Sequence, residues 1–231
     1  MARLLRILPC LLAALAAAPA AGAPDLLQPV NVFTDRDRRG FAGAGEPCAA
    51  AVGLVDADEV GKEGTGTLVE HPRIVLTAAH VVLDPAHGRP ARRVTFRLGY
   101  RDGRSAAAIG ARVAAVGTTR PGTVETARDD WAILVLDRPA PAARPFALLQ
   151  PTTATLVAHH RGALSLIAYS DDRAGGERAS VEHGCSVVGE RYGRFLHDCS
   201  TAAGASGGAL AIASAPPEAP AAVEQSCRKR P

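Results

Sequence analysis

The feature that most constrains the fold is the way turn-forming residues divide the apolar sequence into short runs. The 231-residue chain contains 23 glycines and 17 prolines, and both residue types end regular elements or fix turns. No long stretch shows the 3.6-residue periodicity of an amphipathic helix. Short apolar runs separated by turn signals are typical of an all-β domain. Because aromatic residues make up only 4% of the chain, Val, Leu, Ile and Ala must fill its core.

The apolar runs predict a series of short strands, separated by turn signals such as the Asp102-Gly103 pair. These strands are expected at residues 50–55, 66–69, 74–77, 94–98, 113–116, 131–136, 155–158, 164–169, 186–189, 194–197 and 209–213. The chain is long enough for one large domain or two small ones, and long enough to bury a substantial core.

The first residues have the features of a secretory signal peptide. Arg3 and Arg6 supply positive charge, residues 7–18 are mostly apolar, and small residues follow up to Ala23. The apolar run is shorter than the roughly 20 residues that span a bilayer, so we expect no stable membrane anchor. We therefore expect a secreted or periplasmic protein, with residues 1–23 removed. The cleavage site stays open, because Pro24 makes a cut after Ala23 awkward.

The rest of the chain divides into three segments by composition. Residues 24–47 mix Asp, Arg, Gly and Pro without periodicity, which indicates a flexible leader or propeptide. Residues 48–213 contain the predicted strands and form the predicted folded domain. Residues 214–231 are rich in Ala, Pro and Glu and cannot bury much apolar surface, so we expect a disordered tail.

The charge of the chain argues against a nucleic-acid partner. Of 26 basic side chains, Arg3 and Arg6 leave with the signal, and the remaining 24 face 23 acidic ones. Nucleic-acid binders normally carry a strong basic excess on one face. Here the two signs are mixed along the chain, as on a solvated surface.

Three segments carry residue types that together can perform nucleophilic catalysis. The first reads TAAH and places His80 at the end of a buried strand, where small residues let an imidazole point into a cleft. The second reads DWAIL and starts with Asp130, whose partly buried carboxylate can accept the imidazole Nδ1 proton. The third reads GASGG and surrounds Ser206 with glycines that permit a tight backbone. Each segment alone is weakly specific, because such residues also occur in turns and linkers.

In this order, the three segments resemble the signatures of chymotrypsin-fold serine peptidases. The resemblance implies two six-stranded antiparallel β-barrels, with the active site in the cleft between them. It implies Ser206 as nucleophile, His80 as general base and then acid, and Asp130 as the residue that orients His80. The N–H groups of Gly204 and Ser206 are expected to hold the oxyanion of a tetrahedral intermediate. We expect a monomeric endopeptidase that acts on polypeptides and needs no metal or cofactor.

Details of the sequence are similar to the bacterial glutamyl endopeptidase branch. Val81 and Ala205 stand where vertebrate-type enzymes carry a Cys and an Asp, so activation through a new N-terminal amine is not expected. Thr201 lies five residues before Ser206, where glutamyl-specific relatives place a Thr or Ser that lines the specificity pocket. GASGG also fits the nucleophile elbow of α/β-hydrolases, but that fold needs an Asp and a His after the serine. No such residue follows Ser206.

The resemblance weakens after Leu210. Family members continue with two strands that close the second barrel and flank the substrate, but here the sequence turns into a Pro- and Ala-rich stretch. Because proline cannot donate to a sheet ladder, we expect an incomplete second barrel and an open cleft beside Ser206. Two functions therefore stay open: a secreted endopeptidase, with weak and poorly selective activity, or an impaired or truncated homologue that binds peptides.

The cysteines of an exported chain are expected to form disulfides rather than a metal site. Cys185 and Cys199 flank a short predicted hairpin before the Ser206 loop, and a bridge there stabilises the chain by roughly 3 kcal/mol. By elimination, Cys48 and Cys227 are expected to pair. The adjacent pair His159-His160 invites a metal interpretation, but neighbouring residues on a strand point to opposite faces, so we interpret them as structural.

Overall fold

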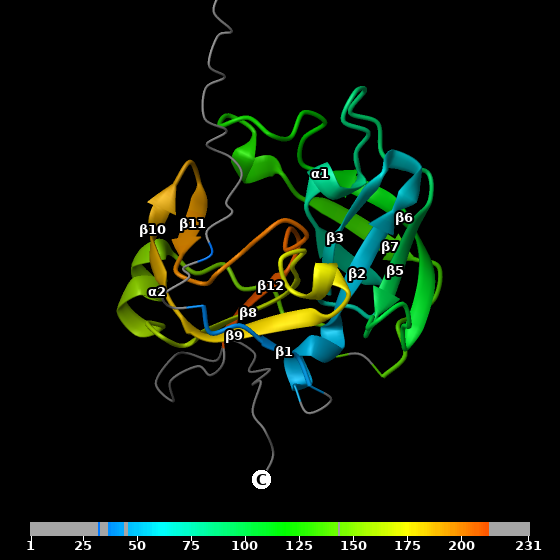
Figure 1. Cartoon of the computed structure of the whole chain (residues 1–231). Coiled ribbons are helices and arrows are strands. Elements are labelled where there is room, and N and C mark those ends of the chain that lie inside the picture. Colours follow the sequence, from blue (N-terminus) through cyan, green and yellow to red (C-terminus); the bar gives the residue numbers. More distant parts are fainter. Residues whose placement is uncertain (1–31, 33–36, 44–45, 143, 213–231) are drawn as a thin grey trace, which may run out of the picture.

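A closed barrel of six antiparallel strands forms the first half of the protein (Figure 1). The computed structural model describes residues 32, 37–43, 46–142 and 144–212. The barrel strands close in the order β2-β3-β4-β7-β6-β5. They are β2 (Val52–Ala57), β3 (Lys62–Leu68), β4 (Ile74–Thr77), β5 (Val94–Leu98), β6 (Ala107–Val116) and β7 (Ala132–Leu136).

Alternating side chains explain why these segments form a barrel. In β5, Val94, Phe96 and Leu98 are buried and the residues between them are partly exposed, which is the two-residue period of a half-buried strand. The barrel core is filled mainly by Val, Leu, Ile and Ala, and Phe96 is the only aromatic among its fully buried residues in the described part of the chain. This matches the core expected from the low aromatic content.

The second half contains a four-stranded antiparallel sheet and a separate hairpin. The sheet has the order β1 (Gly40–Phe41), β9 (Ala179–Cys185), β8 (Leu164–Tyr169) and β12 (Ala209–Ile212). The hairpin consists of β10 (Val187–Arg191) and β11 (Arg194–His197), and lies beside the sheet in Figure 1. Within the described residues the sheet and the hairpin do not close. The expected all-β fold, with a complete first barrel and an incomplete second one, is confirmed.

Helices are few and short. Among the described residues, the α-helices are α1 (Ala79–Val82) and α2 (Thr153–His159). The 3-10 helices are η1 (Pro47–Ala51), η2 (Asp58–Val60), η3 (Ala127–Asp129) and η4 (Ala174–Gly176). In the part of the chain that the structure describes, no helix has the length and apolarity needed to cross a membrane.

The predicted strand at residues 155–158 is wrong, because these residues lie in α2. The hydroxyl of Thr152 accepts the Thr155 N–H at 3.1 Å and caps the helix. One face of the helix buries Leu156 against a small apolar cluster that includes Val187. Capping and packing thus outweigh the β propensity of these residues. His159 consequently ends a helix instead of lying on a strand.

Strand β9 was not predicted from the sequence. It contains Glu182 and His183, which interrupt any apolar run, and it is a strand because β1 and β8 pair with its two edges. Its central Glu182 is only 1% exposed. A charged residue at a buried strand position gives no pattern from which the strand could be recognised.

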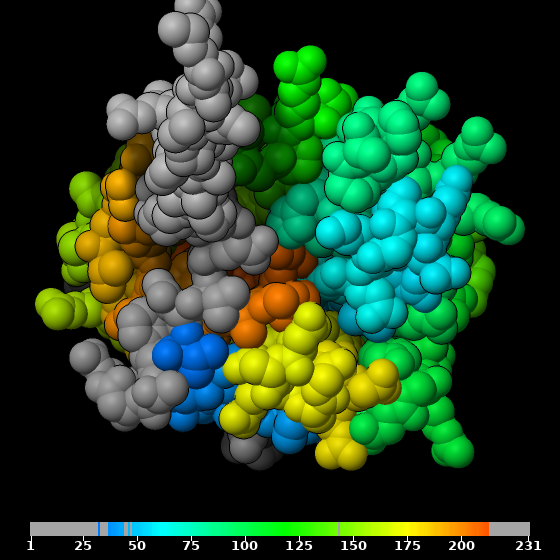
Figure 2. All heavy atoms as spheres, turned by 45° about the horizontal axis from the view of Figure 1, so that its top comes forward, coloured from blue at the N-terminus to red at the C-terminus, as the bar shows by residue number. Residues whose placement is uncertain are grey.

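The folded chain begins before Cys48, within the segment expected to be a leader. Residues 37–43 contain β1 and, in blue in Figure 2, lie against the yellow part of the second half. The buried Arg39 guanidinium holds this segment, because it lies 2.8 Å from an Asp37 carboxylate oxygen and 2.6 Å from an Asp172 one. The predicted signal peptide and C-terminal tail lie outside the described residues.

The Arg39 contact predicts a pH-dependent contribution to stability. The hydrogen bond from the Arg39 side chain lowers the pKa of Asp37 from 3.8 to about 2. A carboxyl with a lowered pKa stabilises the folded state above its unfolded pKa, and this contribution is lost as the pH falls through the folded value. We expect Asp37→Asn to lower the free energy of unfolding by about 1 kcal/mol at pH 7.

Urea unfolding at pH 7, 5, 4 and 3 measures this difference. The difference in free energy of unfolding between the parent protein and Asp37→Asn should be constant from pH 7 to 5 and should shrink between pH 4 and 3. The matched control is Asp58→Asn on the exposed surface of η2, for which no difference from the parent protein is expected. An Asp37→Asn difference that stays constant down to pH 3 would contradict the assignment.

Candidate active site

The structure brings the three predicted residues together in one line. His80 Nδ1 lies 2.7 Å from Asp130 Oδ2, and His80 Nε2 lies 2.8 Å from Ser206 Oγ. His80 and Asp130 come from the first barrel, and Ser206 lies in the loop that leads into β12. In Figure 2 the orange atoms of this loop lie between the cyan first barrel and the yellow second half. The site therefore lies where the two halves meet.

His80 owes its position to the end of β4. The strand ends at Thr77, and α1 begins two residues later with Ala79, Val81 and Val82 facing the core. The remaining side chain of this turn, His80, consequently faces outward and is 44% exposed. A Cβ on Gly64 would lie only 2.7 Å from Val81, so the glycine in β3 makes room for this turn.

Asp130 is the central residue of a tight turn before β7. Its φ of −78° and ψ of 61° are those of an inverse γ-turn, and the Trp131 N–H donates to the Asp129 carbonyl at 2.9 Å. The turn separates the two neighbouring carboxylates. Asp130 faces His80, whereas Asp129 lies 3.5 Å from the exposed Arg128 guanidinium. This turn is the reason why Asp130, the acid expected from the sequence, contacts His80 and the adjacent Asp129 does not.

Both oxygens of the Asp130 carboxylate are used by His80. Oδ2 faces the ring nitrogen, and Oδ1 accepts the His80 backbone N–H at 3.0 Å. Burial raises the pKa of Asp130, but the hydrogen bonds and charge of His80 outweigh this effect and hold the pKa below its ordinary value. Asp130 is therefore an anion at neutral pH, and it fixes both the position and the orientation of the imidazole.

Two glycines shape the loop around Ser206. Gly204 has a φ of +83° and Gly207 a φ of +86°, which other residues rarely adopt. Neither position has room for a side chain. A Cβ on Gly204 would lie 2.4 Å from Asp171 Oδ1, and one on Gly207 would lie 2.1 Å from the Thr65 carbonyl oxygen. The GASGG sequence is thus required by the backbone path.

Carbonyl groups of the Ser206 loop accept hydrogen bonds from the first barrel, whereas two of its backbone N–H groups have no acceptor among the described residues. The carbonyl oxygens of Gly204 and Ser206 both accept hydrogen bonds from Thr65. The N–H groups of Gly204 and Ser206, the two expected oxyanion donors, donate to no other residue in the described part of the chain. Unpaired amides next to a nucleophilic hydroxyl are the arrangement that an oxyanion site needs.

A hollow of about 420 Å³ lies beside Ser206. Its lining contains Thr201, the residue expected from the sequence to line a specificity pocket, together with Arg194 and His197 from β11. Among the described residues that line it, none carries a carboxylate. A second hollow of about 650 Å³ lies at the 99–106 turn and contains none of the predicted site residues. Among the described residues, no group of three or more His, Cys, Asp or Glu side chains is arranged to hold a metal.

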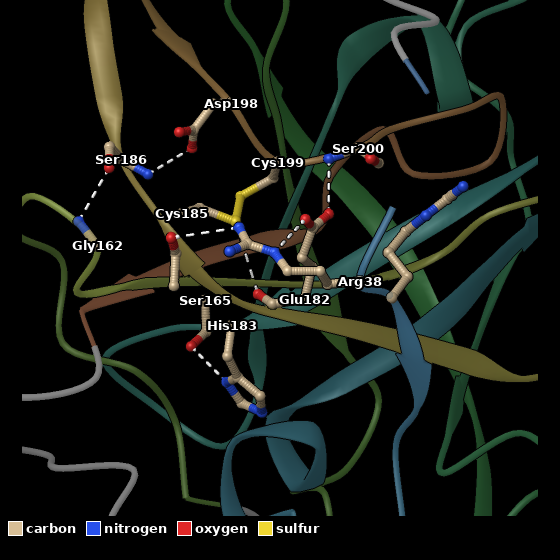
Figure 3. Close-up of a disulfide and its surroundings, with 12 residues drawn as sticks. Arg38, Gly162, Ser165, Glu182, His183, Cys185, Ser186, Asp198, Cys199 and Ser200 are labelled. Carbon is tan, nitrogen blue, oxygen red and sulfur yellow. Dashed lines mark hydrogen bonds and ion pairs between the residues drawn. A yellow bond between two sulfur atoms is a disulfide. The ribbon is translucent and has the colours of Figure 1, made fainter. Parts of the chain in front are cut away.

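The predicted disulfide between Cys185 and Cys199 is present, with the two Cα atoms 5.3 Å apart (Figure 3). It links the end of β9 to the segment that enters the Ser206 loop. Cys48 is also disulfide-bonded, and its partner lies outside the described residues. The pairing of Cys48 with Cys227 therefore stays a prediction.

Glu182 is a buried acid near the site that sequence reasoning missed. Its Oε2 accepts the Ser200 N–H at 2.7 Å, and its Oε1 lies 3.6 Å from the Arg38 guanidinium (Figure 3). Glu182 thus joins the N-terminal segment to the chain that leads to Ser206. In the sequence it has the appearance of an ordinary surface charge, so no signal marked it.

Replacing Glu182 should weaken the fold strongly. Glu182→Ala leaves the buried Ser200 N–H without its acceptor and opens a cavity where the side chain was, so we expect a loss of about 2–4 kcal/mol. Glu182→Gln keeps an acceptor for Ser200 and should lose about 1–3 kcal/mol. Urea unfolding measures both, with Glu125→Gln on the surface as the matched control. The role of Glu182 would be refuted if Glu182→Ala unfolded at the same urea concentration as the parent protein.

Comparison with known proteins places this geometry in a family. The family model described as "Trypsin-like peptidase domain" matches residues 64–213, which include all three motifs. The chain belongs to the trypsin-like peptidase family. No curated protein sequence matches this trypsin-like peptidase.

Solved structures share the fold of this trypsin-like peptidase. The thermostable serine protease AL20 from an extremophilic microorganism has a TM-score of 0.52 and 22% identity, over 71% of this chain and 79% of that chain. A Glu endopeptidase solved in complex with MPD has a TM-score of 0.57 and 20% identity, over 78% and 84%. The protease Anisep from Arthrobacter nicotinovorans has a TM-score of 0.56 and 16% identity, over 75% and 80%. At these identities the likeness shows the fold alone.

Proposed function

We propose that this protein is an exported serine endopeptidase that hydrolyses peptide bonds through an acyl-enzyme formed on Ser206. The observation that carries the proposal is the unbroken line from Asp130 through His80 to Ser206, with contacts of 2.7 and 2.8 Å. These are the distances over which a nucleophile and its base transfer a proton. Membership of the trypsin-like peptidase family supports a polypeptide substrate.

In the first half of the reaction, Ser206 Oγ attacks the scissile carbonyl carbon while its proton passes to His80 Nε2. The resulting imidazolium is stabilised by the Asp130 carboxylate at Nδ1. The negative oxygen of the tetrahedral intermediate accepts hydrogen bonds from the N–H groups of Gly204 and Ser206. These two groups donate to no other acceptor in the described part of the chain. The C–N bond then breaks, and His80 gives its proton to the leaving amine.

In the second half, a water molecule replaces the amine. His80 Nε2 takes a proton from the water as its oxygen attacks the ester carbon, and the same oxyanion site holds the second intermediate. Breaking the ester C–O bond returns the proton to Ser206 Oγ and releases the carboxylic acid product. The enzyme is then in its starting state.

The hollow beside Ser206 is proposed to take the substrate side chain next to the scissile bond. The described residues of its lining include Thr201, Arg194 and His197, and none of them carries a carboxylate that could pair with a basic side chain. Acidic or uncharged side chains should therefore be accepted in preference to Lys and Arg.

A peptidase-deficient homologue that binds peptides is the second candidate function. The observation in its favour is the open second half, where β11 and β12 close no barrel within the described residues. A site open on this side would have fewer backbone partners to hold a peptide against Ser206, and such positioning supplies roughly 7–11 kcal/mol of a barrier.

The two functions are separated by hydrolysis assays with casein and with a nitrophenyl ester. An endopeptidase cleaves casein, and Ser206→Ala abolishes the cleavage. Ester hydrolysis that depends on Ser206, without any casein cleavage, would instead support the second candidate. Casein cleavage that persists in Ser206→Ala would rule out the proposed nucleophile.

A further inference from the structure

Thr65 in β3 is a buried residue that the proposed mechanism does not use. It is 0% exposed, and it lies in the first barrel, although most of its hydrogen bonds go to the second half. Its hydroxyl donates to the Gly204 carbonyl at 2.8 Å and accepts the Tyr169 N–H of β8 at 2.9 Å. The hydroxyl thus acts both as donor and as acceptor in hydrogen bonds that join the two halves.

The backbone of Thr65 contacts the same loop. Its N–H donates to the Ser206 carbonyl at 2.9 Å, and its own carbonyl accepts the Thr77 hydroxyl at 2.7 Å. Thr77 ends the strand that leads to His80, so Thr65 lies between the two segments that carry the proposed base and nucleophile. Thr65 therefore fixes the loop on both sides of Ala205.

The Gly204 end of this clamp depends on the Thr65 side chain. Glycine has an intrinsically permissive backbone, so the sequence at Gly204 does not itself fix the direction of its carbonyl. The hydrogen bond from Thr65 Oγ1 supplies that restraint. The Ser206 end is held by a backbone N–H, which any residue at position 65 except proline would provide.

We propose that the Thr65 hydroxyl is a positioning residue for the oxyanion site: by holding the Gly204 carbonyl against the first barrel, it keeps the Gly204 and Ser206 amides aimed at the reacting carbonyl. Thr65 acts through the loop and does not touch the substrate. The inference rests on the proposed function for its kinetic effect, but not for its structural effect. Loss of the hydroxyl should lower kcat more than it raises KM, because the amides bind charge that develops in the transition state.

Thr67 provides a matched control in the same strand. It lies two residues further along β3, and its hydroxyl donates to the Gly207 carbonyl at 3.0 Å. Thr67 thus makes the same kind of contact with the same loop, on the other side of Ser206 from Gly204. A merely structural role of Thr65 predicts the same effect for Thr65→Val and Thr67→Val, whereas the positioning role predicts different effects.

The test compares Thr65→Val, Thr65→Ser and Thr67→Val in steady-state hydrolysis of a nitrophenyl ester. We expect Thr65→Val to lower kcat by about 10- to 100-fold with KM changed less than about threefold. Thr65→Ser keeps the hydroxyl, so its kcat should lie within about threefold of that of the parent protein. The kcat of Thr67→Val should also lie within about threefold of the parent value. Equal losses in the two valine variants, or an unchanged kcat in Thr65→Val, would overturn the inference.

A second measurement keeps the inference testable if the parent protein hydrolyses nothing. The amide resonances of Gly204 and Ser206, followed by NMR, should shift more in Thr65→Val than in Thr67→Val. Unchanged resonances of these two amides in a folded Thr65→Val protein would overturn the positioning role. Changed amides in a protein without activity would instead support the positioning role and count against the proposed function.

Discussion

Replacing Asp130 by Asn is expected to lower kcat/KM by about 10⁴-fold while leaving the fold intact. The reason is the way His80 uses both carboxylate oxygens. The His80 backbone N–H donates to Oδ1, so the amide oxygen of an Asn must stay there and its NH₂ group must face Nδ1. Nδ1 then becomes an acceptor, and the proton moves to Nε2. A histidine protonated at Nε2 cannot accept the Ser206 proton.

The neighbouring acid provides the control for this experiment. Asp129 is adjacent in sequence, but its carboxylate faces Arg128 and is 42% exposed. Asp129→Asn should keep kcat/KM within about twofold of the parent value, because the Asp129 carboxylate contacts Arg128 and not His80. Ester hydrolysis measures both variants, and circular dichroism verifies that they are folded. A loss of less than tenfold in Asp130→Asn would contradict the role assigned to Asp130.

Replacing Gly204 by Ala should have the second largest effect. The new methyl group would lie 2.4 Å from Asp171 Oδ1 and 2.7 Å from the Tyr169 carbonyl oxygen, at a φ of +83°. The loop must therefore move, and the two proposed oxyanion donors move with it. Loss of one such donor costs about 10²–10³-fold in kcat, and we expect a loss of at least this size.

Gly103→Ala separates the effect of the close contacts from the effect of the backbone angle. Gly103 has a φ of +77°, close to that of Gly204, but a Cβ there would meet nothing within 4 Å. Because alanine disfavours a positive φ, the free energy of unfolding of both variants should be lower by about 1 kcal/mol. Only Gly204→Ala should lose activity in ester hydrolysis. Parent-like kcat in Gly204→Ala would show that the loop tolerates displacement and would argue against an oxyanion role for this amide.

The sequence was most informative for features that are encoded by a few consecutive residues. The residues His80, Asp130 and Ser206 could be named because each lies in a short motif whose neighbours are small, apolar or glycine for a stated physical reason. The change of composition after Leu210 similarly indicated that the second half would be incomplete. In both cases the information lies within a few consecutive residues.

The residues that the sequence did not reveal act over long distances in the chain. Thr65 contacts Gly204 and Tyr169, more than one hundred positions away, and nothing in a Gly-Thr-Gly strand indicates those contacts. Glu182 has the appearance of a surface charge, and its burial follows only from the pairing of β9 with β1 and β8. Residues 155–158 show the same limit, because Thr152 capping and the burial of Leu156 decided between helix and strand.

The most direct test of the proposed nucleophile is the reaction of the purified protein with a fluorophosphonate, followed by mass spectrometry of its peptides. This reagent phosphonylates a serine hydroxyl only when a base and an oxyanion site activate it. The proposed mechanism predicts one adduct, on the peptide that contains Ser206, which is absent in Ser206→Ala and strongly reduced in His80→Ala. A folded protein that gives no adduct, or that is labelled at a serine other than Ser206, would contradict it.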